Sequence, residues 1–369
     1  MRALYISPHL SATNFGGSLF AATNLQLLRE AFAGCVSAAS VSRTPDEAAI
    51  AIPSTKSKLG TAVANLQGLC GTLTMEGVAQ LQILLTSERP SLIWLDTSIL
   101  GVLIPLIKSI VPEAKIVCAF QNVELDLVRQ RIANLQLQYL PALYATWLNE
   151  RESARRSDLT LALHATDAER IRSIYGRRVD RILPIIVPDR EVASGHPMPK
   201  PDKREPYILF VGSAFPPNIE ALEFLCARVA PLLQRFRIVA VGTGLETAAL
   251  RLQHSRLEIR GFVDDLTSIY DGAAAVVAPI FSGGGMKVKI AEALMHGKTV
   301  IASPFAAVGY ESCSESSMQL AETPAEFALH IENLDFQSRN NTSRIDYERF
   351  FSRNAGLKHM KEIISLVGH

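Results

Sequence analysis

A glycine-rich loop with two lysines is the part of this sequence best suited to chemistry. Three consecutive glycines, Gly283, Gly284 and Gly285, are followed by Lys287 and Lys289. Glycine has no Cβ, so its backbone can turn at positive φ and let a ligand approach closely. If a helix begins directly after the loop, its first turn points N–H groups at the same ligand. The pattern therefore predicts a phosphate-binding loop.

The two lysines should supply most of the binding energy. A hydrogen bond to a charged group contributes roughly 1.5–3 kcal/mol, whereas a helix dipole usually contributes roughly 0.3–1 kcal/mol. Glu292, one turn later, would repel phosphate, but its carboxylate can accept hydrogen bonds from the paired hydroxyls of a ribose. A glycine turn beside solvated lysines is also common in α/β proteins, and the spacing alone does not separate these interpretations.

The sequence around the loop resembles a known family. The segment 261–279, the glycine loop and the segment 297–303 have the order and spacing of the donor-binding domain of GT-B glycosyltransferases, in the retaining, metal-independent group that uses nucleotide sugars. The resemblance is close from residue 207 to residue 309 and looser elsewhere. It implies that the protein moves a sugar from a nucleoside diphosphate to an acceptor hydroxyl, with no separate cofactor and no metal.

The resemblance also implies roles for particular residues. Lys287 and Lys289 would bind the donor diphosphate and stabilise the leaving group, and Glu292 would bind the ribose. Phe262 and Val263 fall where the family contacts the base.

Two positions depart from the family pattern. A second glutamate, which touches the donor sugar in many members, is replaced by Gly284, so sugar contacts would come from backbone N–H groups around Gly284 to Met286. An Arg and a Lys that many members carry after the first strand of this domain are replaced by Ser213 and Asn218. The phosphate charge would therefore rest on the two lysines of the glycine loop.

Candidates in the first half of the chain are fewer. Gly16 and Gly17 follow the first predicted strand, where the family's glycine pair faces the donor phosphates, although a simple tight turn explains them nearly as well. Gln121 stands where a family motif has a histidine near the donor sugar. Because glutamine cannot take a proton at neutral pH, a general base at this position is excluded. Glu124 fits either an ion-pair role or the start of a helix.

Two histidines are further candidates for substrate contact, and a third has a structural explanation. His164 follows a predicted strand and His9 lies in the first loop, so either could reach a substrate. His296 precedes Gly297 and fits a position near a helix C-terminus.

Alternating strands and helices must position these residues. Apolar runs predict strands in both halves: 3–6, 35–39, 92–95, 116–120 and 159–163, then 208–211, 238–241, 257–259, 275–278 and 300–302. Helical patterns cover 20–32, 62–85 and 125–152. This alternation predicts an α/β fold of two doubly wound, Rossmann-like domains facing across a cleft, whose closure would exclude water.

Domain boundaries follow from composition. Six prolines between Pro184 and Pro206 predict an extended connection. We expect an acceptor-side domain over 1–186, completed by a C-terminal helix at about 345–369, a linker over 187–205, and a donor-binding domain over 206–344.

Composition favours a cytoplasmic protein. The 37 basic and 36 acidic residues nearly cancel, which argues against a nucleic-acid partner. Five scattered cysteines favour reduced thiols over a disulfide framework or a zinc site. The longest apolar window is far shorter than the ~20 residues that span a bilayer. An arginine-rich stretch over 150–181 favours a solvated helix face over peripheral contact with the inner membrane face.

Three other functions remain open on the sequence alone. The segment beginning Gly242-Thr-Gly244 half-matches a dinucleotide fingerprint, which would suggest an oxidoreductase, but the third glycine is missing. A nucleotide-sugar epimerase would share the two-domain layout, and a catalytically silent nucleotide-binding subunit would fit the missing glutamate and histidine. The preferred partners are a nucleotide-sugar donor and a saccharide or lipid-linked saccharide acceptor, while the base, sugar, acceptor and oligomeric state are not specified.

Overall fold

The protein divides into two compact α/β units. The structure, a computed structural model, describes residues 1–11, 16–189, 206–335 and 339–368. One unit comprises Met1–Pro184 and Gly356–His369, and the other comprises Ile185–Ala355. Most of the expected linker, residues 190–205, lies outside the described residues.

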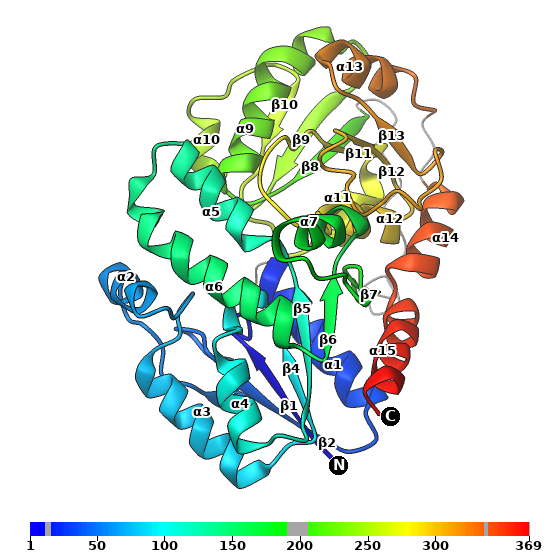
Figure 1. Ribbon diagram of the computed structural model, residues 1–369. Helices are drawn as coiled ribbons and strands as arrows, with labels where there is room; N and C mark the ends of the chain where they lie inside the picture. The colour runs from blue at the N-terminus through cyan, green and yellow to red at the C-terminus, as the bar shows by residue number, and fades with distance from the viewer. Residues whose placement is uncertain (12–15, 190–205, 336–338, 369) are drawn as a thin grey trace. The chain divides into compact units, whose positions relative to one another are not determined.

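The first unit is built on a seven-stranded parallel sheet (Figure 1). Its strands are β1 (Arg2–Ser7), β2 (Cys35–Ser40), β3 (Ile50–Ala51), β4 (Leu92–Leu95), β5 (Lys115–Phe120), β6 (Leu159–Ala162) and β7 (Arg181–Ile182). They lie in the order β3-β2-β1-β4-β5-β6-β7. The order reverses between β1 and β4, and ligands of open parallel sheets bind where such a reversal meets the carboxyl ends of the strands.

Helices cover both faces of this sheet. Alternate residues of the strands, such as Leu4, Ile93 and Cys118, share one apolar core with residues of the helices α2 to α7. On the opposite face, Tyr5 stacks on Trp94, and the Tyr5 hydroxyl oxygen lies 3.1 Å from the carbonyl oxygen of Ala21 in helix α1 (Gly16–Ala31). Burial on both faces explains why these strands are almost wholly apolar.

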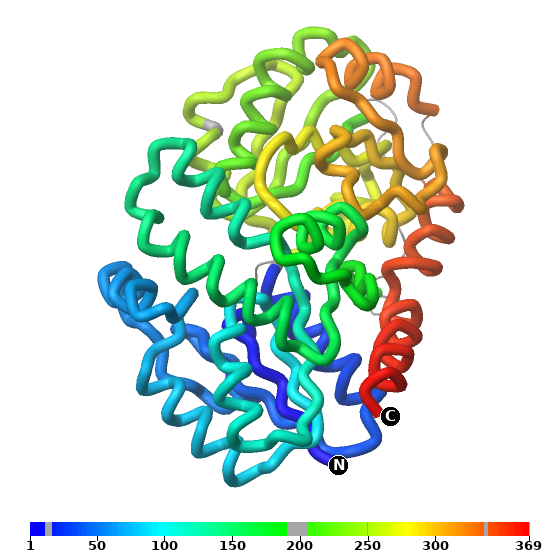
Figure 2. The backbone as a smooth tube through the Cα atoms, in the orientation of Figure 1, coloured from blue at the N-terminus to red at the C-terminus, as the bar shows by residue number. Residues whose placement is uncertain are grey.

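Two helices expected in the first unit are each divided in the structure. The expected helix 62–85 is split into α2 (Lys58–Leu66) and α3 (Met75–Glu88), because Gly68 and Gly71 adopt positive φ between them. The expected helix 125–152 is split into α5 (Glu124–Ala133) and α6 (Leu140–Arg156). Leu135 is left-handed at this break, and Pro141 begins α6. Figure 2 shows α5 and α6 as an antiparallel pair. The remaining helices of this layer are α4 (Leu103–Ile110) and α7 (Ala165–Tyr175).

The second unit repeats the same topology with six parallel strands. They are β8 (Tyr207–Val211), β9 (Arg237–Val241), β10 (Leu257–Ile259), β11 (Ala275–Ala278), β12 (Thr299–Ala302) and β13 (Met318–Leu320). Their order is β10-β9-β8-β11-β12-β13, so the reversal lies between β8 and β11. The helices are α9 (Pro216–Phe224), α10 (Glu246–Ala249), α11 (Thr267–Gly272), α12 (Val288–Met295), α13 (Pro324–Glu332) and α14 (Asn341–Phe350). The carboxyl ends of β8 and β11 are therefore the expected ligand edge.

The expected C-terminal helix is also divided. Helix α14 ends at Phe350, and α15 (Arg353–Val367) begins after Ser352, whose hydroxyl accepts a hydrogen bond of 3.3 Å from the N–H of Ala355. Most of α15 groups with the first unit, whereas α14 belongs to the second. Within the described residues, no helix combines the length and apolar character needed to cross a membrane.

Candidate nucleotide-binding site

The glycine loop connects β11 to α12 at the reversal point of the second sheet. Gly283 and Gly285 adopt φ values of 105° and 61°, a region that favours glycine. Lys287 is the residue before α12 and makes no side-chain cap to the helix. The loop and the first turn of α12 therefore have the backbone geometry that the sequence predicted for an anion site.

Lys289 in α12 reaches across to residues in and after β8. Its Nζ donates a hydrogen bond of 2.7 Å to Oδ1 of Asn218 in α9 and lies 4.6 Å from the ring centroid of Phe210 in β8. The pKa of Lys289 is lowered to about 7, mainly by burial and also by the nearby charge of Lys287, while Glu292 opposes the change. Because the surroundings disfavour the charged form of Lys289, a bound anion would stabilise its ammonium group.

The side chain of Lys287 forms hydrogen bonds with the backbone of the glycine loop. Its Nζ donates to the carbonyls of Gly284 at 3.2 Å and Gly285 at 2.6 Å, and it lies 4.8 Å from the ring centroid of Phe305. The Tyr310 hydroxyl donates to the Lys287 carbonyl at 2.8 Å. The second cation is thus positioned by the same loop that would bind phosphate.

The loop after β8 packs closely against its neighbours. Asn218 donates through Nδ2 to the Ser213 carbonyl at 2.9 Å, so this one side chain contacts both Ser213 and Lys289. A Cβ at Gly242, after β9, would lie 2.0 Å from the Gly212 carbonyl oxygen. Gly242 therefore has a packing role, and the helix that follows it, α10, spans only four residues. A dinucleotide fingerprint instead leads directly into a full helix of a βαβ unit.

Glu292 lies three residues after Lys289 and hence on the same side of α12. Its Oε2 accepts a hydrogen bond of 3.3 Å from the hydroxyl of Tyr270 in α11. The Tyr270 ring stacks on His296 with centroids 4.7 Å apart, and His296 Nδ1 lies 3.2 Å from Oδ1 of Asp271. The Glu292 carboxylate, which the sequence predicts to bind ribose, is therefore held by Tyr270. His296, directly after α12, packs on the Tyr270 ring and so supports this contact.

Phe262 and Val263 follow β10 at the same edge of the sheet. The N–H of Phe262 donates to Oε1 of Glu246 at 3.1 Å, and 64% of the Phe262 side chain is exposed. Met286, by contrast, is buried: a Cβ at Gly309 would lie 2.7 Å from its Cγ. Met286 can thus offer a ligand its backbone, as the sequence suggested, rather than its side chain.

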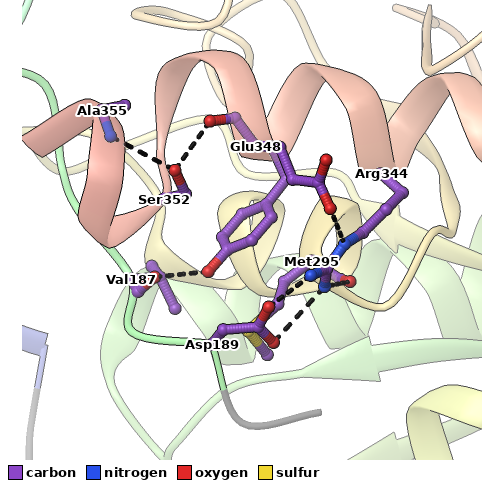
Figure 3. A network of polar contacts seen from close by, with 8 residues as sticks. Val187, Asp189, Met295, Arg344, Glu348, Ser352 and Ala355 are labelled. Carbon is purple, nitrogen blue, oxygen red and sulfur yellow. Dashed lines mark hydrogen bonds and ion pairs between the residues drawn. The ribbon is translucent and has the colours of Figure 1, made fainter. Parts of the chain in front are cut away.

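A polar network fixes the other end of α12 (Figure 3). Arg344 in α14 donates to the carbonyl of Met295 at 2.8 Å and also forms an ion pair with Asp189 through both terminal nitrogens. The Tyr347 hydroxyl donates at 2.8 Å to the carbonyl of Val187. The helix that carries the two lysines is therefore held at its C-terminus by α14 and by the segment that enters the second unit. The members of this network, Val187, Asp189, Arg344 and Tyr347, were not predicted as site residues.

Gln121 lies in the first unit, at the carboxyl end of β5. Its Nε2 donates to Asp96 twice, to Oδ2 at 3.0 Å and to the backbone carbonyl at 2.9 Å. Asp96 also accepts from the hydroxyls of Ser7, at 2.8 Å, and Tyr5. Burial raises the pKa of Asp96 to about 7 against these hydrogen bonds. Asp96 was missed by the sequence analysis, although an acidic residue directly after a fully apolar strand was the available signal.

The other candidates of the first unit have mainly local contacts. Helix α1 begins at Gly16 and continues through Gly17, while residues 12–15 lie outside the described part. His164 caps α7, because its Nδ1 accepts the N–H of Asp167 at 3.2 Å. Burial lowers the pKa of His9 to about 4. Burial raises the pKa of Glu124, which accepts from Asn122 at 3.0 Å at the start of α5.

The structure thus brings one set of predicted residues together. These residues share the ligand edge of the second unit: Ser213, Asn218, Phe262, Val263, Gly283, Gly284, Gly285, Met286, Lys287, Lys289 and Glu292. Gln121, Gly16 and Gly17 lie in the first unit.

Comparison with known proteins agrees with this geometry. Residues 205–334 match the family described as Glycosyl transferases group 1. Among curated proteins, none matches the sequence.

Several solved structures share the fold at low sequence identity. The structure of Anabaena HepE in complex with UDP-glucose has a TM-score of 0.67 and 13% identity and covers 99% of both chains. The lipopolysaccharide outer core galactosyltransferase WaaB in its apo form has a TM-score of 0.68 and 14% identity, also with 99% of both chains covered. A glycosyltransferase from Rickettsia africae has a TM-score of 0.67 and 14% identity, covering 99% of this chain and 98% of that chain. Residues 205–334 are thus similar to the Glycosyl transferases group 1 family, in a chain with the α/β, two-domain GT-B fold.

Proposed function

We propose that this protein is a glycosyltransferase that moves a sugar from a nucleoside diphosphate to an acceptor hydroxyl. The observation that carries the proposal is Lys289, an ammonium group of lowered pKa beside a glycine loop, at the reversal point of the second sheet. The group 1 domain match over the same residues supports it.

The chemistry follows from where charge develops. As the glycosidic bond of the donor stretches, negative charge accumulates on the departing diphosphate, and fixed positive charge placed there in advance lowers the barrier. Lys289 and Lys287 supply this charge, together with the N–H groups at the start of α12. Asn218 holds the Lys289 ammonium at 2.7 Å before the donor binds, and phosphate oxygens would replace that amide oxygen.

Further details belong to the same proposal. Glu292 binds the ribose, the segment around Phe262 contacts the base, and Gln121 contacts the donor sugar. Retention of configuration is part of the proposal because the family resemblance implies it. The reaction proceeds without a metal, since the lysines supply the charge that a divalent cation would otherwise provide. The acceptor is a saccharide or lipid-linked saccharide used in surface polysaccharide assembly at the cytoplasmic side of the membrane.

The first experiment is a thermal-shift panel of nucleoside diphosphates. UDP is the first to test, because the similar Anabaena HepE structure contains UDP-glucose. We expect one diphosphate to stabilise the wild type and to bind about thirtyfold more weakly to Lys289→Ala, from the loss of about 2 kcal/mol. Lys361→Ala, which removes an exposed lysine of α15, is the matched control and should bind like the wild type. Equal binding by all three proteins would remove Lys289 from the site.

A turnover assay then separates transfer from the alternatives. Release of the nucleoside diphosphate that depends on an added saccharide acceptor supports transfer. Interconversion of the sugar without an acceptor would indicate an epimerase, and tight nucleotide binding without any turnover would indicate a silent subunit.

A further inference from the structure

Helix α2 of the first unit exposes an apolar stripe that the proposed transfer does not use. Leu59, Val63 and Leu66 are spaced four and three residues apart and therefore lie on one side of the helix. Leu59 is 76% exposed and Leu66 is 74% exposed. The opposite side carries Ala64 and Asn65, which are buried. The stripe thus faces away from the protein core.

Helix α6 repeats this pattern with larger side chains. The same spacing occurs at Leu140, Tyr144 and Trp147, which are all exposed. The ring centroids of Tyr144 and Trp147 lie 6.2 Å apart. The turn that leads into α6 adds Leu135, which is 85% exposed, and Leu137.

The two helices lie side by side in one layer (Figures 1 and 2). Asn149 in α6 donates to the carbonyl of Gly68, directly after α2, at 2.9 Å, and the Thr146 hydroxyl lies 3.5 Å from the Cys70 thiol. Both helices bury small residues, Ala64 and Ala154, in the same core. Their outer sides therefore form one surface, the α2–α6 face, which consists of Leu59, Val63, Leu66, Leu135, Leu137, Leu140, Tyr144 and Trp147.

The charges beside the α2–α6 face are mainly positive. The segments 56–67 and 129–151 contain five cations, Lys56, Lys58, Arg129, Arg131 and Arg151, and one carboxylate, Glu150. Glu150 is fully buried, where it accepts the N–H groups that begin α5 and the hydroxyls of Ser98 and Tyr175. Two of the arginines form ion pairs, Arg129 with Asp126 and Arg151 with Glu152. Lys56, Lys58 and Arg131 are exposed and leave the surroundings of the face with a net positive charge.

We infer that the α2–α6 face binds an anionic lipid surface. Leucine side chains enter the acyl boundary, tyrosine and tryptophan rings suit the interface, and lysine and arginine pair with lipid phosphates. A second copy of this chain is a poorer partner, because an isologous contact would place cations against cations.

The α2–α6 face meets the arginine-rich stretch 150–181 only at Arg151, which pairs with Glu152. Several arginines of that stretch have partners within the protein: Arg156 pairs with Glu152, Arg177 pairs with Asp180, and Arg155 donates to the Tyr175 carbonyl. The stretch is therefore mainly a solvated face, as the sequence favoured.

Vesicle binding tests the inference without donor or acceptor, so its failure leaves the proposed transfer untouched. We expect the protein to co-sediment with vesicles that contain phosphatidylglycerol and not with pure phosphatidylcholine, and high salt should weaken binding. The double variant Leu59→Ser/Leu66→Ser should bind about tenfold more weakly or worse. Leu250→Ser is the matched control, because Leu250 is equally exposed but lies in the second unit. An unchanged melting temperature establishes that the double variant is folded.

Tryptophan fluorescence gives an independent signal. The chain has two tryptophans, and Trp94 is fully buried, so a blue shift on adding phosphatidylglycerol vesicles reports Trp147. The shift should vanish in Trp147→Phe. The inference is overturned by equal binding of the leucine double variant, by no preference for anionic vesicles, or by a wild-type dimer in light scattering that the leucine double variant abolishes.

Discussion

The charge state of Lys289 is the residue-scale feature on which nucleotide binding should depend. Its pKa is lowered to about 7 in the free protein. Below that pH the side chain is an ammonium and can pair with phosphate. Above it, binding must first add a proton, so affinity should fall by up to about tenfold for each further pH unit until the pKa of the complex is reached.

Titration calorimetry with a nucleotide sugar measures this dependence. A nucleotide sugar is preferred over a free diphosphate, because its phosphates have no terminal group with a second pKa of about 6. We expect a constant dissociation constant below pH 7 and progressive weakening above it, with proton uptake from the buffer. The matched variant Lys289→Arg keeps its charge and should show a flat profile. A falling profile in that variant as well would assign the pH dependence to another group.

The ribose role of Glu292 can be isolated by changing the ligand. Glu292→Ala should weaken binding of the ribonucleoside diphosphate about tenfold or more, because a charge-assisted hydrogen bond is lost. The Glu292→Ala variant and the wild type should bind the 2′,3′-dideoxy analogue equally well, since that ligand offers no hydroxyl pair. Competition binding with both ligands gives the comparison, and a uniform loss for both would mean that Glu292 acts only by supporting α12.

The residues of the glycine loop could be predicted because they are close together in the sequence. Gly283 to Glu292 lie within one loop and one helix, so local backbone rules place them. Asp96, Tyr270 and Arg344 escaped prediction, because their importance comes from partners distant in sequence. Gln121, for example, meets Asp96 across 25 positions. No local pattern encodes that contact.

At the scale of elements, Arg344 holds the C-terminal end of α12. The Arg344→Ala variant removes the hydrogen bond to the Met295 carbonyl and the ion pair with Asp189 (Figure 3). Since the pair is only partly exposed, we expect about 2 kcal/mol of lost stability. We also expect a several-fold rise in KM for the donor, with a smaller change in kcat, because α12 loses the contact that holds its C-terminal end and its first turn is then less well positioned.

Two variants distinguish support from simple destabilisation. Arg344→Lys retains one cation and should recover part of the donor KM. Glu348→Ala removes the exposed partner of the same arginine and should have little effect, since exposed ion pairs contribute about 1 kcal/mol at most. If Arg344→Ala lowers the melting temperature and leaves KM unchanged, the network is structural only.

The strands were predicted more accurately than the long helices, for a physical reason. Parallel strands buried on both faces appear as continuous apolar runs, and all ten expected strands overlap strands of the structure. Three strands were missed: β3 and β7 have two residues each, too short to form a run, and β13 is interrupted by Gln319. The expected helices 62–85 and 125–152 were too long, because apolar side chains continue through breaks that depend on local backbone conformation, as at Leu135.

At the scale of the whole molecule, each unit has its own sheet and its own core, and both tryptophans lie in the first unit. A ligand stabilises the state that binds it by RT ln(1 + [L]/Kd), about 2.7 kcal/mol at a hundredfold excess over Kd. If the units unfold separately, a nucleoside diphosphate bound to the second unit raises only the transition of that unit. Tryptophan fluorescence, which reports the first unit, should then keep its midpoint, while circular dichroism, which reports both sheets, should show a shifted component.

The comparison is best made in Trp147→Phe, because Trp94 then becomes the sole tryptophan signal and lies buried against Tyr5 in the first sheet. Lys289→Ala provides the second arm, in which neither signal should move when the diphosphate is added. Two coincident signals that shift together would show that the units unfold as one cooperative body, despite their separate cores. A shift of the fluorescence midpoint alone would place the nucleotide on the first unit and contradict the assignment of the glycine loop.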